Sequence, residues 1–339
     1  MHRYHPVVAT PLTDVPASLG ADGVRRLYRL MLLTRLLDER LWIVVRQGKA
    51  HFVLTGRGHE AAQCASALAV HAGSDWVYTY YRSLGAAIAL GFTPYEIFLG
   101  VLGKAADPIS GARQLPNHFS SRRLRTPTVS SSVATQIPHA VGTAWATHLR
   151  GEPVATLCYF GEGATSKGEF HEALNVAGLH RLPVVFFCEN NGWAISVPLA
   201  EQVAGGSVAA RAAGYGMPGV LVDGLDPLAV YQATDEALRR ARRGDGPTLI
   251  EATCLRLTPH SSDDSDAYRS DDERAALAAR DPLPAFRDRL LAAGLIAPDE
   301  PERWTDEFRA SLLADQDRAD ALPPPTAERA RRWLYQEPR

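Results

Sequence analysis

Short, continuous apolar runs alternate with helical patterns through the middle of the chain. Residues 154–160 and 184–188 are apolar runs of strand length, and residues 168–180 between them carry large apolar side chains at helical spacing. Continuous apolar strands are typical of a parallel sheet that is buried on both faces. The alternation continues further on, and the expected elements are a strand at 220–222, a helix from an N-cap at Asp226 to Arg243, and a strand at 248–255. The pattern predicts a doubly wound α/β fold with a mainly parallel sheet.

The flanking regions divide the chain into three parts. A long helical pattern starts at Asp22, a residue type suited to an N-cap, and ends at Gly48. The other expected elements are a helix over 58–71, a strand-like stretch at 76–80, a loop over 103–128, and a helical tail broken by Pro323, Pro324 and Pro325. We therefore predict an extended N-terminal arm (1–20), an α/β domain (21–295) and a helical C-terminal tail (296–339).

Composition and charge narrow the class of protein. Of the 339 residues, 46% are hydrophobic and 22% are charged, and the formal net charge is -2, which fits an ordinary globular protein. No basic block indicates nucleic-acid binding, and no apolar run approaches the roughly 20 residues of a membrane-spanning helix. The four cysteines lie far apart, so we expect reduced core thiols. The N-terminus has no signal or transit pattern, and we expect a cytoplasmic protein without membrane or nucleic-acid partners.

Two of the predicted strand ends carry unusual polar sequences. The first is GEGATS at 161–166, and the second is ENNG at 189–192. The 26 residues between Gly163 and Asn190 are enough for one crossover helix and one strand. Ligands of α/β folds bind beyond the carboxyl ends of the strands, so neighbouring strands would bring these two sequences together.

The chemistry of these ends indicates a divalent cation and a diphosphate. The glycines let the backbone approach an anion, but the Glu162 carboxylate would repel a phosphate unless a cation lay between them. Mg²⁺ takes about six oxygens, and Glu162, the Asn191 side chain and a backbone carbonyl of the following turn could supply three of them. A Walker loop would need Gly-Lys-Ser or Gly-Lys-Thr, whereas here Lys167 precedes Gly168. The Rossmann fingerprint would need a glycine in place of Ser166.

The Gly-Glu-Gly turn followed by Asn-Asn at this spacing resembles the thiamine diphosphate and magnesium motif. The stretch YFGEGATSKGEFHEALNVAGLHRLPVVFFCENNGWAIS is similar to the alpha subunits of branched-chain 2-oxo acid dehydrogenases. The resemblance covers residues 20–290, and its further blocks are RQGKAHF, GHEAAQCASALAV, DWVYTYYRSLG, SSVATQIPHAVG and TPHSSDDSDAYRS. It implies the three-layer, doubly wound thiamine diphosphate-binding fold.

The resemblance also implies a role for each matching residue. Glu162, Asn191 and the carbonyl of Trp193 would bind Mg²⁺, and the backbone N–H groups of Gly163 and Ala164 would hold the diphosphate. The other matches are Tyr81 and Arg82 at the cofactor phosphates, Ser131 and Val133 beside the thiamine rings, Ser130, Ser132, Thr135 and Gln136 in a K⁺-binding loop, and His260 at the mouth of the site, where it serves decarboxylation or acyl transfer to lipoate.

Some of these assignments have a structural alternative. Residues 130–136 could form only a helix N-terminus with hydroxyl caps, and His260 could cap a helix or lie in the acidic loop that follows it. The chain also departs from the family pattern. Glu189 stands where some members carry a diphosphate-binding arginine, Trp193 replaces a tyrosine, and Ser132 replaces a proline.

The resemblance implies oxidative decarboxylation of 2-oxo acids such as 3-methyl-2-oxobutanoate, in branched-chain amino acid catabolism. The acyl group would pass to a lipoyl domain, and two alpha and two beta subunits would form a heterotetramer bound to a lipoyl-bearing acyltransferase core in a multienzyme complex. In this family the beta subunit supplies the glutamate that tunes the aminopyrimidine, so we expect the chain to be inactive alone. Two alternatives stay open: a pyruvate or acetoin dehydrogenase alpha subunit, and a non-catalytic scaffold subunit. Ser261 and Ser262 align with a loop that is phosphorylated in some members.

Overall fold

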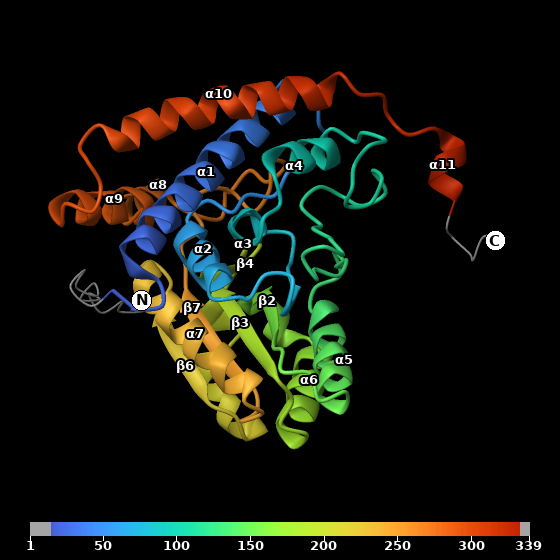
Figure 1. Ribbon diagram of the computed structural model, residues 1–339, viewed down its shortest axis with the longest axis vertical. Coiled ribbons are helices and arrows are strands. Elements are labelled where there is room, and N and C mark those ends of the chain that lie inside the picture. Colours follow the sequence, from blue (N-terminus) through green and yellow to red (C-terminus); the bar gives the residue numbers. More distant parts are fainter. Residues whose placement is uncertain (1–14, 333–339) are drawn as a thin grey trace.

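A sheet of five strands forms the centre of the computed structural model, which describes residues 15–332 (Figure 1). Each strand pairs in parallel with its neighbours, in the order β1-β2-β3-β7-β6. The strands are β1 (Trp76–Tyr78), β2 (Thr156–Gly161), β3 (Val184–Asn190), β6 (Gly219–Asp223) and β7 (Thr248–Thr253). This order makes β2 and β3, whose ends carry the two polar sequences, direct neighbours.

Helices cover both faces of the sheet, and the side chains of its central strands alternate between two apolar layers. Leu157 and Tyr159 of β2 belong to the larger core, whereas Cys158 and Phe160 belong to the smaller one. The larger core is formed with α1 (Gly20–Arg46), α2 (Glu60–Leu68) and α7 (Pro227–Arg242), and the smaller core with α5 (Gln136–Leu149) and α6 (Gly168–Leu179). This three-layer arrangement confirms the predicted doubly wound α/β fold.

The remaining elements lie above the sheet in Figure 1 or connect its strands. Helix α10 lies along α1 and contacts α4, while α11 lies apart from the sheet. Trp304 and Leu312 of α10 are buried in the same core as α1. These elements are α3 (Leu84–Leu90), α4 (Pro94–Val101), the 3₁₀ helices η2 (Glu162–Ser166), η3 (Leu199–Glu201) and η4 (Ala209–Tyr215), the short strands β4 (Trp193–Ala194) and β5 (Val197–Pro198), and helices α8 (Asp271–Ala278), α9 (Pro282–Ala292), α10 (Glu300–Asp320) and α11 (Ala327–Arg331).

The helix caps agree with the sequence in one case and differ in the other. Asp226 caps α7, because its side chain accepts a hydrogen bond of 3.1 Å from the N–H of Leu228. The predicted N-cap at Asp22 is wrong. Helix α1 begins at Gly20 after Leu19, so Asp22 lies in the first helical turn, where its charge faces the positive end of the helix dipole. Residues 1–14 of the predicted arm lie outside the described residues.

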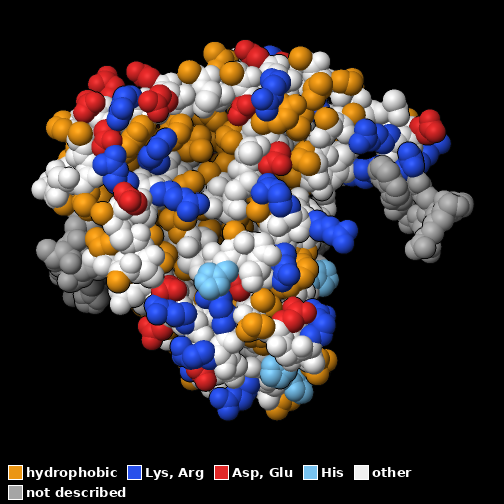
Figure 2. Space-filling model, in the orientation of Figure 1, with side chains coloured by type: hydrophobic (Ala, Val, Ile, Leu, Met, Phe, Trp, Pro, Cys, Tyr) orange, Lys and Arg blue, Asp and Glu red, His pale blue; other side chains and the backbone are white. Residues whose placement is uncertain are grey.

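The surface and the cysteines fit the expectations from composition. Figure 2 shows hydrophobic side chains gathered in the upper part of this face, over α1, α4 and α10, with charged side chains of both signs among them. Cys64, Cys158, Cys188 and Cys254 are buried and form no disulfide bond, as predicted. No helix within residues 15–332 is long and apolar enough to cross a membrane.

Candidate active site

The ends of β2 and β3 lie side by side at one edge of the sheet. Gly161 pairs in register with Glu189, so the sequences that follow the two strands leave the sheet at the same place. The backbone N–H of Asn191 donates a hydrogen bond of 3.3 Å to Oε2 of Glu162. Both residues line a cavity of about 420 Å³. The structure therefore brings together the two polar sequences that the strand-end argument places near each other.

Glu162 is a buried carboxylate with one oxygen that lacks a partner. The residue is 1% exposed, and its Oε1 has no hydrogen-bond partner among the described residues. Burial raises the pKa of Glu162 to about 6, because removal from water penalises the charged form. A charged oxygen in this position is unfavourable unless a cation or a donor approaches it. Glu162 thus presents the acceptor that a small cation would use.

The turn after β3 adds further oxygens to the same region. Gly192 has a φ of 83°, a left-handed conformation that suits glycine, and the turn places Asn191 and Trp193 on the cavity wall. Oδ1 of Asn191 accepts a hydrogen bond of 3.1 Å from the N–H of Trp193. A carboxylate, a carboxamide oxygen and a backbone carbonyl are ligand types that Mg²⁺ takes in proteins. Within residues 15–332, no group of three or more His, Cys, Asp and Glu side chains is placed to hold a metal ion.

Gly163 permits close packing where the cavity meets β4. A Cβ atom at Gly163 would lie 2.7 Å from the Cβ of Ala194, closer than two side-chain carbons approach one another. Glycine therefore lets the backbone of η2 lie directly against β4. The same backbone, at Gly163 and Ala164, lines the cavity.

Tyr81, Arg82 and His260 form another part of the cavity wall. Nη1 of the buried Arg82 donates a hydrogen bond of 2.6 Å to the carbonyl of Thr55, and its Nη2 lies 3.1 Å from Nδ1 of His260. The Tyr81 and His260 rings meet edge to face, with centroids 5.9 Å apart. Burial, together with the charges of Arg82 and Arg256, lowers the pKa of His260 to about 4. The imidazole is therefore neutral at pH 7, with Nδ1 accepting from Arg82 and the hydrogen on Nε2.

The segment before α5 contributes most, but not all, of the residues predicted there. Ser130, Ser131, Val133 and Gln136 line the cavity, whereas Ser132 and Thr135 do not. Oγ of Ser131 lies 2.7 Å from Nε2 of His118, and Nε2 of Gln136 donates to the carbonyl of Tyr159. Thr135 is the N-cap residue of α5, but its side chain makes no capping hydrogen bond.

The structure also places on the wall several residues that the sequence did not single out. They are Tyr80, Ala134, Phe160, Lys167, Ala194 and Ile195. Each of these lies within two residues of a predicted site residue except Lys167, which follows the last residue of η2. Their position near a motif was the only signal in the sequence. The sequence does not show whether the side chain of a residue near a motif faces the cavity or the core.

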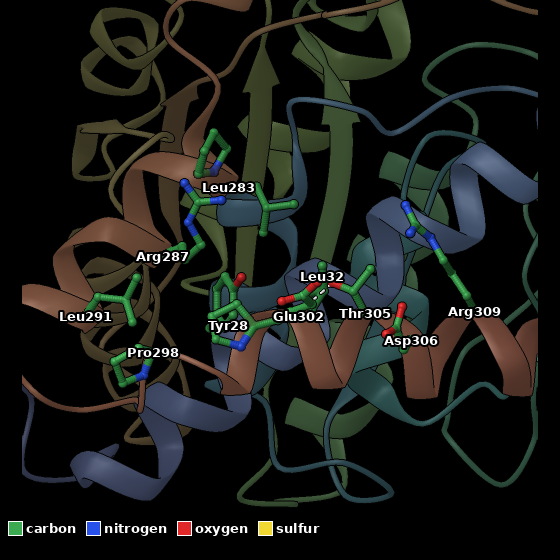
Figure 3. A pocket seen from close by; sticks show the side chains of 12 residues that line it. Tyr28, Leu32, Leu283, Arg287, Leu291, Pro298, Glu302, Thr305, Asp306 and Arg309 are labelled. Carbon is green, nitrogen blue, oxygen red and sulfur yellow. Dashed lines mark hydrogen bonds between the residues drawn. The ribbon is translucent and has the colours of Figure 1, made fainter.

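A second hollow lies between α1, α9 and α10 and has a volume of about 440 Å³. Figure 3 shows Tyr28 and Leu32 of α1, Arg287 and Leu291 of α9, and Glu302 of α10 around it. It shares no lining residue with the cavity at the strand ends. The motif residues therefore single out the strand-end cavity as the candidate active site.

Comparisons with known proteins agree with this fold and show the family to which the chain belongs. Residues 28–328 match the family described as Dehydrogenase E1 component, and the chain belongs to that family. It is 46% identical over 310 residues to the 2-oxoisovalerate dehydrogenase subunit alpha of Bacillus subtilis, a match that covers 91% of this chain and 94% of that protein.

Two further relatives are alpha subunits as well. The mitochondrial 2-oxoisovalerate dehydrogenase subunit alpha of Homo sapiens is 38% identical over 321 residues, which cover 94% of this chain and 72% of that protein. The 3-methyl-2-oxobutanoate dehydrogenase subunit alpha of Mycobacterium tuberculosis is 41% identical over 278 residues, which cover 82% of this chain and 73% of that protein. These matches confirm the resemblance to thiamine diphosphate-dependent dehydrogenase subunits.

Proposed function

We propose that this chain is the alpha subunit of a branched-chain 2-oxo acid dehydrogenase that acts on substrates such as 3-methyl-2-oxobutanoate. The relatives described above are named for dehydrogenases of this substrate class. The observation that carries the proposal is the contact between Asn191 and Glu162 on the wall of one cavity. Its volume of about 420 Å³ falls in the range of small-molecule sites, about 300–1,000 Å³.

Mg²⁺ and the cofactor diphosphate would bind at the strand ends. Glu162, Oδ1 of Asn191 and the carbonyl of Trp193 would hold the cation, and the partnerless Oε1 of Glu162 supports this assignment. The backbone of Gly163 and Ala164 would approach the phosphates. Because a carboxylate faces the same space, the cation would have to neutralise both negative groups.

Arg82 would serve the cofactor phosphates, and His260 would serve the substrate. When bound, thiamine diphosphate supplies the nucleophilic carbon and the electron sink for decarboxylation. Arg82, with Tyr81 beside it, would pair with phosphate oxygens. His260 is neutral at pH 7, so its Nε2–H can donate a hydrogen bond to a substrate carboxylate or carbonyl oxygen.

Ser131 and Val133 would contact the thiamine rings. Both line the cavity, and Val133 is 43% exposed, so it offers an apolar surface to a ligand or partner. We retain K⁺ as a proposed ligand of the segment 130–136, although Ser132 and Thr135 do not reach the cavity.

A beta subunit would complete the site. Among residues 15–332, Glu162 is the one carboxylate on the cavity wall, so the glutamate that tunes the aminopyrimidine has to come from elsewhere. Exposed apolar side chains of Val133, Ile195 and Val197 lie at or beside this wall, which suits a protein partner. We therefore propose a heterotetramer of two alpha and two beta subunits, which delivers its acyl group to a lipoyl-bearing acyltransferase core.

The test is to purify the chain with and without its beta subunit and to follow decarboxylation with an artificial electron acceptor. We expect turnover only in the assembled protein, with a higher kcat/KM for 3-methyl-2-oxobutanoate than for pyruvate. Full turnover by the isolated chain would refute the shared site. A preference for pyruvate would favour the pyruvate dehydrogenase alternative, and an assembled protein that binds no cofactor would favour a scaffold.

A further inference from the structure

Glu189 is a second buried carboxylate beside the site, near the end of β3. The residue is fully buried and does not line the cavity. Its Oε2 accepts three hydrogen bonds, from Nδ1 of His59 at 2.6 Å, from Nε2 of Gln63 at 2.8 Å and from the hydroxyl of Tyr80 at 2.9 Å. Such a cluster of donors fixes the position of Glu189 and, in turn, the ring of His59.

His59 connects this carboxylate to Asn191. The His59 ring is fully buried, with Nδ1 toward Glu189 and Nε2 3.3 Å from Nδ2 of Asn191. Since the Glu189 carboxylate only accepts, Nδ1 carries the hydrogen and Nε2 is left as an acceptor. The Asn191 amide group donates to that acceptor.

The two ends of the Asn191 carboxamide are therefore fixed independently. The N–H of Trp193 requires an acceptor and meets Oδ1 of Asn191, while Nε2 of His59 requires a donor and meets Nδ2. Both contacts demand the same orientation of the amide. In this orientation the carboxamide oxygen lies on the side of the N–H of Trp193, whose backbone follows the wall of the cavity.

We propose that His59 is a positioning residue for the metal site: held by Glu189, it keeps the oxygen of Asn191 turned toward the cation. The inference rests on the proposed function, because it presupposes that Asn191 binds Mg²⁺. A buried partner that orients a metal ligand typically contributes about 10- to 100-fold in metal affinity. The role is separate from catalysis, since His59 does not touch the cavity.

Two substitutions of similar size distinguish the two bonds of the ring. In His59→Gln, the amide oxygen can take the place of Nε2 and still accept from Asn191. In His59→Asn, the amide nitrogen can take the place of Nδ1 and donate to Glu189, but the side chain is too short to reach Asn191. The measurement is the Mg²⁺ concentration that gives half-maximal binding of thiamine diphosphate to the assembled alpha and beta subunits, by calorimetry.

We expect His59→Asn to raise this Mg²⁺ concentration about 10- to 100-fold, and His59→Gln to raise it less than about threefold. Melting temperatures measured in EDTA should be alike for the two variants. If both variants require the same Mg²⁺ concentration as the parent, His59 does not position Asn191. An equal rise in the required Mg²⁺ concentration in both variants would overturn the inference as well. Glu162→Ala separates this failure from failure of the proposed function: if it leaves the Mg²⁺ dependence unchanged, the metal site itself is misplaced.

A spectroscopic measurement tests the same arrangement without a substitution. In a solid-state NMR spectrum of the parent complex labelled with ¹⁵N-histidine and ¹³C-glutamate, the His59 signal is assigned by magnetisation transfer from Nδ1 to the Glu189 carboxyl carbon. We expect a protonated Nδ1 and a bare Nε2. A ring with its hydrogen on Nε2 would contradict the inference even where the variants fold poorly.

Discussion

The protonation of Glu162 should be visible in the stability of the metal-free chain. Burial gives this carboxyl group a pKa of about 6 in the folded protein, against an ordinary value of 4.5. The difference of about 1.5 units corresponds to about 2 kcal/mol, at about 1.36 kcal/mol per unit. Because the pKa is raised, the folded state binds the proton more tightly than the unfolded state. Stability from this group is therefore present at low pH and is lost as the pH rises through 6.

The perturbation is Glu162→Ala, measured by urea denaturation of the metal-free chain from pH 5 to pH 8. The substitution lowers the free energy of unfolding by a constant amount through lost packing. It also removes the pH-dependent contribution of the Glu162 carboxyl group. The parent should therefore lose about 1 kcal/mol relative to the variant between pH 5 and pH 8, since only part of the 2 kcal/mol is recovered at pH 5. The comparison cancels other titrating groups that both proteins share.

Mg²⁺ with thiamine diphosphate should reverse this penalty at pH 8. The cation would pair with the ionised carboxylate, so the parent should gain stability on adding both ligands and Glu162→Ala should gain far less. A difference between parent and variant that does not change with pH would show that Glu162 is solvated or already paired. That result would remove the basis for a cation site at this carboxylate.

Two further predictions concern packing and buried charge. Gly163→Ala should lower the melting temperature and should weaken the affinity for thiamine diphosphate at least about tenfold, because its Cβ would lie 2.7 Å from that of Ala194. Gly142→Ala in α5 is the control. Its Cβ meets no atom within 4 Å, so it should add about 0.5–1 kcal/mol of helix stability. An unchanged Gly163→Ala variant would contradict the close packing of η2 on β4. Arg35 pairs with the buried Glu60 and the half-buried Asp281, so Arg35→Met should cost about 3–5 kcal/mol in urea denaturation. Arg150→Met removes an exposed ion pair and should leave stability unchanged. Equal effects of the two arginine substitutions would refute this distinction.

The centre of the sheet could be predicted from sequence because β2, β3 and β7 are buried on both faces. An uninterrupted apolar run such as residues 184–188 is too short for a buried helix and has none of the polar positions of a surface loop, and the helix between two such runs leads to parallel pairing. Helix α3 was not predicted, because all seven of its residues are buried and it has no polar face to give a helical period. Helix α4 does carry a signal, the capping box between Thr93 and Glu96, which hydrophobic pattern alone overlooks.

Part of the candidate site could be predicted from the sequence, and part depends on contacts between distant side chains. The convergence of Glu162 and Asn191 follows from strand order and from the length of the crossover, both of which can be estimated from the sequence. The link from Glu189 to His59 could not be predicted, because the two residues are 130 positions apart and belong to separate sequence blocks that carry no signal of a contact between them. Long-range hydrogen bonds depend on side-chain orientations that only the packed structure fixes.

The burial of Glu189 changes where positive charge in the site must come from. The resemblance implies a diphosphate-binding arginine at this position in some members of the family, whereas here a carboxylate is held by His59 and two other donors. The chain therefore has no arginine at this position to meet the phosphates, and the carboxylate that takes its place does not line the cavity. On the described part of the cavity wall, the cationic side chains are Arg82 and Lys167, and Arg82 already donates to a backbone carbonyl and to His260. Diphosphate binding in this protein should consequently depend strongly on the divalent cation, because too few fixed charges face the phosphates to replace it.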